Sequence, residues 1–404
     1  MSFRYAFSRV SGYFNAARRV QARLISSSSY HFHVAASWAA KPPYPATRRM
    51  RPFKPNPAIV SWRDKTLTKL GSPQASPGED FLFTRTQGQR LVFGVADGVG
   101  GWQDQGVDPS LFSQALMYYA DMHSVNASPS ECMKLAYDSV LKDDEVSVGS
   151  STACILSLDA SSGSLTTANL GDSGFCIYRN STIFYASRPQ THHFNCPRQL
   201  SKLKDRSWDF SSDRAIVDHP RAASLHDEAL ADGDIVIAYT DGVSDNVWPA
   251  EIAQICGLAL DRQDSEDTKA QLIASSVVYN ARKFMFNQNR VSPFEAEARQ
   301  HHKRMPGGKV DECVEYIVLC VYQLFPVPQL LLLLSRKQSL DAGFIHLVGP
   351  LLVHGSPFNE TLDHPRGCQR ILLQGDIIVS VNEQVWLNKD FSREFLLKYQ
   401  VAHF

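Results

Sequence analysis

Three segments of the chain share a pattern in which an apolar run ends in an aspartate beside glycine. They cover residues 92–98, 168–174 and 234–242, and their acids are Asp97, Asp172 and Asp241. Each apolar run predicts a buried strand, where a charge is costly unless it is paired or binds a cation. A single Asp-Gly pair is a common turn, but a turn alone needs no acid at the end of a buried strand. Three carboxylates at three strand ends are ligands that hard cations prefer, so the repetition predicts a metal site.

The order of the expected elements favours an α+β fold. Strands are expected at 81–83, 91–96, 152–158, 165–170, 174–178 and 235–240, and helices at 110–122, 129–141, 250–256 and 268–287. Residues 159–164 have the composition of a hairpin turn. Strands that follow one another, with helices set apart in pairs, argue against the regular alternation of a parallel sheet.

Composition sets the broad class of the protein. A chain of 404 residues with 44% apolar content and no net charge fits a large core with extensions, or two domains. The first 63 residues hold eleven Lys or Arg and no acid, so the remainder is acidic on balance and does not suggest nucleic-acid binding. The eight cysteines form no C-x-x-C pair, which predicts buried thiols in a reducing compartment.

The N-terminal segment 1–40 has the composition of a mitochondrial transit peptide. Apolar residues recur at helical spacing from Phe3 to Ala17 among arginines and serines, and residues 23–26 (R-L-I-S) resemble a matrix-processing site. The alternative is a basic arm that binds RNA or anionic lipid. Composition favours targeting, so we expect a mitochondrial-matrix protein. Six prolines then make residues 41–58 a stiff linker.

Six motifs together resemble the metal-dependent, type 2C (PPM) family of serine/threonine protein phosphatases over about residues 66–312. They are 78–80 (G-E-D), 95–102 (V-A-D-G-V-G-G-W), 149–153 (G-S-S-T-A), 168–174 (A-N-L-G-D-S-G), 240–246 (T-D-G-V-S-D-N) and 307–311 (G-G-K-V-D). The D-G-V-G-G-W form and the stretch 193–200 are similar to the mitochondrial branch of that family. The resemblance implies a four-layer α-β-β-α sandwich of two antiparallel sheets flanked by helix pairs, in a domain at 59–323.

The resemblance also implies ligand positions for two Mn²⁺ or Mg²⁺ ions and a weaker third one. They are Glu79, Asp97, Gly98, Asp172, Asp241, Asp245 and Asp311. Asp97 is the implied catalytic residue and bridges both metals. Asp241 and Asp311 complete the first metal site, whereas the Gly98 carbonyl and Glu79 serve the second; the two remaining aspartates match the third. Water activated by the metals would attack phosphorus in line, without a protein nucleophile.

Two departures from the family pattern bear on this mechanism. Many relatives carry a histidine, a candidate general acid, where this chain has Val99. His192 and His193 could replace it, but packing or an exposed loop is the favoured interpretation. After Asp311 the usual register of the last strand is lost, so we expect residues 316–322 to form it while 313–315 bulge out. That would displace Asp311 and suggests the alternative of a catalytically impaired phosphatase-fold binding protein with a C-terminal interaction tail.

The tail at 324–404 diverges from the family. Residues 317–334 are apolar, but Gln323 and two prolines interrupt them, which favours a strand and a linker over a membrane span. Residues 373–382 and 341–345 are weakly similar to PDZ domains; an alternatively spliced or mis-joined tail is the favoured interpretation. The leading prediction is a monomeric phosphatase that acts on phosphoserine and phosphothreonine of mitochondrial proteins.

Overall fold

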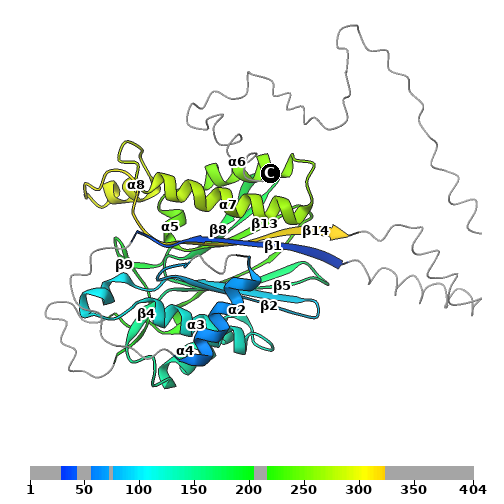
Figure 1. The fold of residues 1–404 in the computed structure, drawn as a ribbon. Coiled ribbons are helices and arrows are strands. Elements are labelled where there is room, and N and C mark those ends of the chain that lie inside the picture. The colour runs from blue at the N-terminus through cyan, green and yellow to red at the C-terminus, as the bar shows by residue number, and fades with distance from the viewer. Residues whose placement is uncertain (1–28, 43–55, 72–75, 204–215, 324–404) are drawn as a thin grey trace, which may run out of the picture. The chain divides into compact units, whose positions relative to one another are not determined.

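Ten strands of the chain form two five-stranded antiparallel sheets that pack face to face (Figure 1). The computed structural model describes residues 29–42, 56–71, 76–203 and 216–323. In order across the first sheet, the strands are β1 (Ser29–Ala39), β14 (Cys313–Gln323), β13 (Ile235–Tyr239), β7 (Gly174–Arg179) and β8 (Thr182–Ala186). In order across the second sheet, they are β12 (Ser224–Ala229), β6 (Ser164–Leu170), β5 (Ala153–Asp159), β3 (Arg90–Ala96) and β2 (Phe81–Gln87).

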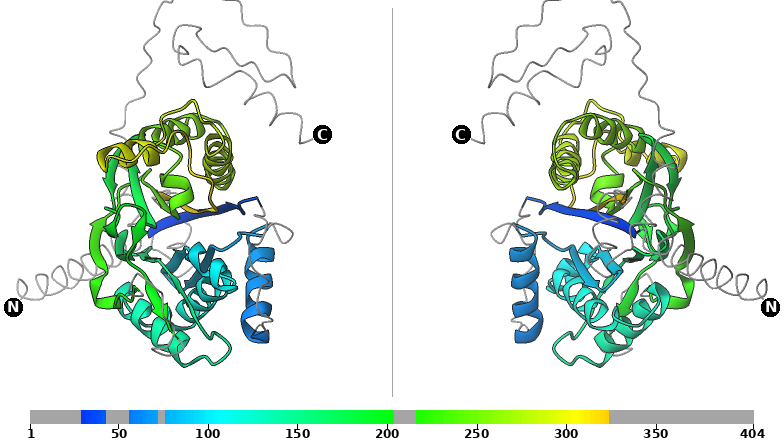
Figure 2. Two further views of the ribbon diagram at one scale, coloured as in Figure 1. Left: turned by 90° about the vertical axis from the view of Figure 1, so that its left-hand side faces the viewer. Right: turned by 90° about the vertical axis from the view of Figure 1, so that its right-hand side faces the viewer.

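Helices cover the outer face of each sheet, and the side views of Figure 2 show the same order of layers. The first sheet is covered by α5 (Asp241–Ser244), α6 (Pro249–Leu260) and α7 (Glu266–Phe284), and α8 (Pro293–Gln300) follows them in the chain. The second carries α3 (Ser110–His123) and α4 (Pro129–Lys142), and α2 (Pro57–Lys69) packs on α3. This arrangement confirms the predicted four-layer α+β sandwich.

Short elements fill the loops at the edge of the sandwich. They are the 3₁₀ turns η1 (Gly100–Gln105) and η2 (Pro220–Ala222), and the paired strands β4 (Gly149–Ser151) with β11 (Leu200–Lys202) and β9 (Thr191–His193) with β10 (Cys196–Pro197). Serine side chains fix the starts of several helices: those of Ser128, Ser265 and Ser292 accept the backbone N–H three residues on in α4, α7 and α8. Such caps satisfy amides that a helix leaves unpaired.

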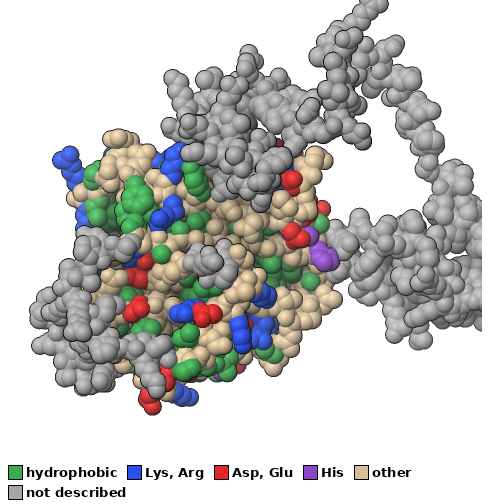
Figure 3. Space-filling view, in the orientation of Figure 1, with side chains coloured by type: hydrophobic (Ala, Val, Ile, Leu, Met, Phe, Trp, Pro, Cys, Tyr) green, Lys and Arg blue, Asp and Glu red, His purple; other side chains and the backbone are tan. Residues whose placement is uncertain are grey.

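Strand β14 contributes to both apolar layers because its side chains alternate between the two faces of the first sheet. Between the sheets, Tyr316 stacks on Phe93 of β3 with ring centroids 4.6 Å apart, and its hydroxyl lies 2.7 Å from that of Thr84. On the opposite face, Ile317 packs in the same cluster as Val277 of α7. On the face drawn in Figure 3, basic and acidic side chains are interspersed.

The N-terminal boundary of the fold was predicted wrongly. Residues 29–39, which lay within the expected targeting segment 1–40, form β1, and every residue pairs with β14, from Ser29 opposite Gln323 to Ala39 opposite Cys313. Helix α2 likewise begins at Pro57, inside the expected linker 41–58. The basic composition of this segment suggested a targeting sequence, and the partner strand of β1, β14, lies near the other end of the domain. The rest of the targeting segment and residues 43–55 lie outside the described part of the chain.

The expected bulge at 313–315 is also absent from β14. Cys313 opens the strand in register with β1, and Glu315 pairs with Tyr239 of β13. The Thr240 N–H donates to the Val314 carbonyl, and the Val314 N–H donates to the Thr240 hydroxyl. Regular pairing forces Glu315 onto the same face as Ile317, towards the helices. The Glu315 side chain is fully buried, and neither of its carboxylate oxygens has a hydrogen-bond partner among the described residues.

The apolar stretch 317–334 divides at the end of β14. Residues up to Gln323 lie in this strand between two others, and residues 324–404, including the PDZ-like segments, lie outside the described part of the chain. None of the helices in the described part is both long enough and apolar enough to cross a membrane.

Candidate metal centre

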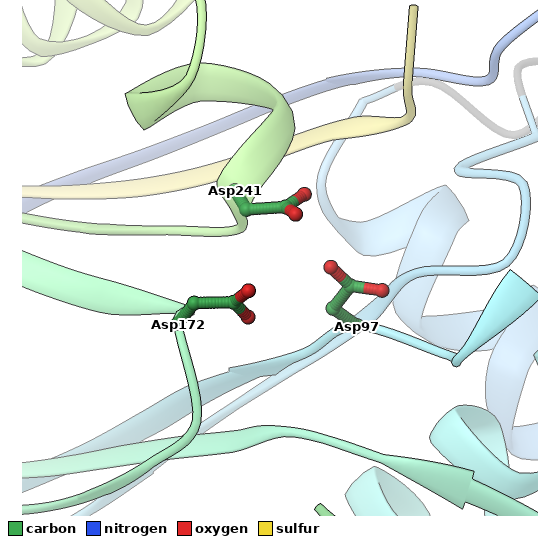
Figure 4. A group of neighbouring side chains, drawn as sticks. All are labelled: Asp97, Asp172 and Asp241. Atoms are coloured by element: carbon green, nitrogen blue, oxygen red, sulfur yellow. The ribbon is translucent and has the colours of Figure 1, made fainter. Parts of the chain in front are cut away.

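Three aspartates meet at one edge of the sandwich, as the strand pattern predicts (Figure 4). Asp97 follows β3, Asp172 lies between β6 and β7, and Asp241 follows β13 as the first residue of α5. One carboxylate oxygen from each lies within 4.8 Å of the others. The two sheets therefore deliver the three acids from opposite layers to one point.

The backbone around Asp97 is fixed by its neighbours on β4 and β5. The Asp97 N–H donates to the hydroxyl of Thr152 at 3.0 Å, and the Asp97 carbonyl accepts from the hydroxyl of Ser151 at 2.7 Å and from the Thr152 N–H at 3.0 Å. Thr152 is itself 2.6 Å from the hydroxyl of Ser173, next to Asp172. These hydrogen bonds link the positions of Asp97 and Asp172.

Glycine lets the two acid-bearing turns approach their neighbours closely. A Cβ on Gly98 would lie 2.5 Å from the carbonyl oxygen of Glu79 and 2.7 Å from that of Pro109. A Cβ on Gly242 would collide with the carbonyl oxygen of Glu312. Any other residue at either position would push apart loops that carry candidate ligands.

Several acid oxygens of this cluster have no hydrogen-bond partner among the described residues. Oδ1 of Asp172, Oδ1 of Asp241 and Oδ2 of Asp80 are buried in this state. Burial, followed by the charges of neighbouring acids, raises the pKa of Asp80, Asp97 and Asp172 well above the usual range. Buried carboxylates that repel one another and lack donors fit a hard divalent cation, which binds through oxygen.

Lys309 joins three further candidate ligands. Its ammonium contacts Asp241 Oδ2 and lies 2.9 Å from Asp245 Oδ2 and 3.1 Å from Asp311 Oδ2. Asp241 and Asp245 are one helical turn apart and so share a face of α5. Burial alone would lower the pKa of Lys309, but the three acids outweigh it and raise the pKa well above its usual value.

The same charges set the protonation of Asp245 and Asp311. Burial raises the pKa of Asp245 to about 7, although Lys309 opposes the shift. Burial would also raise the pKa of Asp311, but Lys309 and a hydrogen bond from Glu312 lower it below the usual range. Lys309 therefore keeps the Asp311 carboxylate charged and close to those of Asp241 and Asp245.

Lys41 pairs with a further group of acids, Glu79, Glu312 and Asp311. Its ammonium lies 2.7 Å from Glu79 Oε2, 2.9 Å from Glu312 Oε2 and 4.0 Å from Asp311 Oδ1. Gln103 also donates to Glu79. Burial and a hydrogen bond to Asp311 raise the pKa of Glu312 to about 8. All seven predicted positions thus lie at one edge, although only Asp97, Asp172 and Asp241 form a single tight group.

Four residues of the site received no role from the sequence: Lys41, Asp80, Lys309 and Glu312. Asp80 and Glu312 stand directly beside predicted ligands, which is a usable signal. The two lysines gave none, because a lysine in a loop usually lies on the surface. His192 lies 2.9 Å from Asp218, and His193 faces the carbonyl of Phe194, on the exposed strand β9.

Known proteins share both the sequence and the fold. No protein-family profile matches the chain. The human protein phosphatase PTC7 homolog is 36% identical over 253 residues, which cover 61% of this chain and 80% of the relative. The PTC7 homolog fig of Drosophila willistoni is 34% identical over 249 residues, which cover 60% of this chain and 77% of the relative.

A solved structure shares the architecture. The photosystem II phosphatase PBCP superposes with a TM-score of 0.52 at 24% identity, over 72% of this chain and 98% of that one, which shows the fold. The identity and coverage of the PTC7 relatives extend this likeness to the family. The chain therefore belongs to the metal-dependent type 2C (PPM) family and is a protein serine/threonine phosphatase.

Proposed function

We propose that this phosphatase removes phosphate from phosphoserine and phosphothreonine of mitochondrial proteins with two Mn²⁺ or Mg²⁺ ions held at the acid cluster. The observation that carries the proposal is the meeting of Asp97, Asp172 and Asp241 within 4.8 Å, with buried and unpartnered oxygens on two of them. Carboxylates in this state need cations, and cations are what phosphoryl transfer requires.

The contacts suggest how the residues divide between the ions. Asp241 and Asp311 would hold the first ion, since one ammonium already contacts both. Asp97, whose backbone is hydrogen-bonded to Ser151 and Thr152, would serve both ions. Glu79 and the carbonyl of Gly98 would serve the second, since the backbones of these two residues approach each other closely. The remaining aspartates of the seven would hold a third, weaker ion.

Divalent ions bound here would polarise the phosphoryl oxygens and make water more acidic. The acids of the chain hold this charge in a partly buried site, where electrostatic stabilisation is stronger than in water. Water attacks phosphorus as the bond to the serine or threonine oxygen breaks, and the departing alkoxide takes up a proton. Val99 has no titratable group, so we assign that proton to solvent.

Hydrolysis of a phosphothreonine peptide by the full chain tests the enzyme proposal. We expect turnover that needs Mn²⁺ or Mg²⁺ and that falls by at least about a thousandfold in Asp97→Asn, the loss expected when electrostatic stabilisation of the transition state is removed. Asp138→Asn is the matched control, because the half-exposed carboxylate of Asp138 on α4 forms a surface ion pair with Lys134 and has no place in the acid cluster. Equal inactivity of wild type and Asp97→Asn with saturating Mn²⁺ would favour the binding-protein alternative.

For localisation, we propose that a mitochondrial-matrix signal lies upstream of β1. Any cut that leaves the first sheet whole must precede Ser29, and the R-L-I-S pattern at 23–26 meets that condition. A fluorescent protein fused to residues 1–28 should enter mitochondria. Fusion to the same segment with its arginines replaced by glutamine should remain outside, and equal import of the two would refute the proposal.

A further inference from the structure

Lys309 is placed so that its side chain reaches into the acid cluster. Its N–H donates to Asn246 Oδ1 at 2.9 Å, and its carbonyl accepts from Asn246 Nδ2 at 2.8 Å. Asn246 is fully buried, so this double hydrogen bond fixes the backbone of Lys309. The side chain is itself 18% exposed.

The ammonium of Lys309 contacts the same two carboxylates to which the proposed function assigns the first metal ion. It binds Asp241 and Asp311 through their Oδ2 atoms and adds Asp245 on the same side. An ion that binds both Asp241 and Asp311 must lie between these carboxylates, and an ammonium within hydrogen-bond distance of both fills that space. A divalent cation and the ammonium would also repel each other strongly at such a separation.

We propose that Lys309 is an internal cation that holds the metal-free site together and that the first metal ion must displace. This inference rests on the proposed metal binding at the same acids. Without metal, the positive charge offsets the repulsion among buried carboxylates that would otherwise destabilise the fold. The same charge lowers the affinity of the site for metal.

A second position for the displaced ammonium lies nearby. Lys309 Nζ is 5.5 Å from the centre of the Phe294 ring on α8, within the range of a cation–π interaction. The fixed backbone and flexible side chain allow the ammonium to move towards this ring without a change in the loop. Lys309 is thus a positioning residue, and we assign it no contact with substrate.

The test compares Lys309→Met with wild type in two measurements that do not involve turnover. Titration calorimetry with Mn²⁺ should show about tenfold tighter binding by the variant, the effect of removing one charge-assisted competitor. Thermal unfolding in EDTA should show a midpoint lower by roughly 5 °C, whereas saturating Mn²⁺ should restore wild-type stability. Lys303→Met is the matched control: Lys303 lies six residues earlier, over the ring of Phe194.

Each outcome bears on the inference. Mn²⁺ affinity of Lys309→Met that equals or falls below that of wild type overturns it. If the Met variant folds only with Mn²⁺, Lys309→Arg decides, since restored charge should restore the metal-free fold and failure to do so refutes the idea. Absence of Mn²⁺ binding by wild type overturns the proposed metal site itself, which is a different result from binding that the substitution leaves unchanged.

Discussion

Strands β3 and β14 each lie one strand in from an edge of their sheets and end or begin beside the acid cluster, yet they differ in the side chains that they bury. Residues 91–96 of β3 are all apolar or glycine and buried. Strand β14 follows Asp311 and Glu312, and it buries Glu315 with both oxygens unpartnered among the described residues. Asp97 and Asp311, the acids beside these strands, nevertheless both lie at the cluster, because residues in direct contact with each acid hold it there.

This difference shows that the position of an acid and the packing of the strand beside it are separate requirements, although a sequence motif contains both. Asp97 is held by hydrogen bonds to Ser151 and Thr152, and Asp311 by Lys309. Neither depends on which side chains fill the strand beyond the site. A carboxyl at position 315 therefore acts on the free energy of unfolding and leaves the geometry of the site intact.

The largest effect should come from removing the neighbour of β14. A chain that begins at residue 40 lacks β1, so β14 loses one complete set of backbone partners and becomes an exposed edge. We expect it to aggregate or remain unfolded, a loss of more than about 5 kcal/mol. Size-exclusion chromatography and thermal unfolding would show this against a chain that begins at residue 28. Equal melting temperatures for the two chains would show that β1 is dispensable.

Substitutions of the stacked rings of Phe93 and Tyr316 test whether the inner faces of β3 and β14 are equally well packed. Phe93→Ala and Tyr316→Ala should each lower the free energy of unfolding by about 3–5 kcal/mol, because each leaves a cavity between the sheets. Chemical denaturation gives both values. Tyr316→Phe, which removes only the hydroxyl bonded to Thr84, is the control and should cost about 1 kcal/mol. A loss below that value for Tyr316→Ala would mean that this layer is loose.

Replacing Glu315 should stabilise the protein. Glu315→Val removes a buried carboxyl without partners and should raise the free energy of unfolding by about 2 kcal/mol at pH 8. Burial raises the pKa of Glu315 well above its usual range. Its contribution to stability is therefore complete below the unfolded-state pKa of about 4.3 and is lost as the pH rises towards the folded-state pKa.

The gain from Glu315→Val should accordingly be smaller near pH 4, where the carboxyl is neutral and only its missing hydrogen bonds remain a cost. Denaturation at several pH values would measure this change. Glu315→Gln keeps the size of the side chain and should remove the same pH dependence. A variant whose profile matches that of wild type would show that Glu315 does not titrate in this way.

The smallest effect concerns the support of Asp97. Thr152→Val removes the hydroxyl that accepts from the Asp97 N–H, which should cost about 1 kcal/mol of stability. Mn²⁺ binding should weaken as well, since Asp97 becomes less well fixed. Calorimetry can compare the Mn²⁺ affinity of Thr152→Val with that of Thr152→Ser, which keeps the hydroxyl and should behave as wild type. Unchanged Mn²⁺ affinity in Thr152→Val would show that the strand alone positions Asp97.

Much of the fold was accessible from local pattern. The apolar run that ends at Asp97 and the helical pattern of the segments that became α4 and α7 are signals contained in a few consecutive residues. Strand β1 was missed because its pairing with β14 joins distant parts of the chain, while arginines and prolines around it suggested a leader and linker. The regular start of β14 was missed because the residues after Asp311 depart from the register of the family pattern, which suggested a bulge.

The residues of the site likewise divide into those that a local pattern predicted and those that it did not. Strand-end aspartates were predicted because their cost in a buried position demands a function. Lys41 and Lys309 were not, since a lysine becomes informative only when the acids around it are known, and Asp241 lies far from Lys309 in the sequence. Charge compensation across the chain is a property of the folded state, and local patterns do not contain it.

The pairing of β1 with β14 has a consequence for how the protein is made. The chain is synthesised from its N-terminus, so β1 is made long before its partner β14. The pairing that ends with Ala39 opposite Cys313 can form only after β14 has been synthesised. Closing so long a loop is slow, because chain entropy is lost before the contacts form. Until the two strands pair, both present unpaired backbone, and a nascent chain should bind a chaperone in that interval.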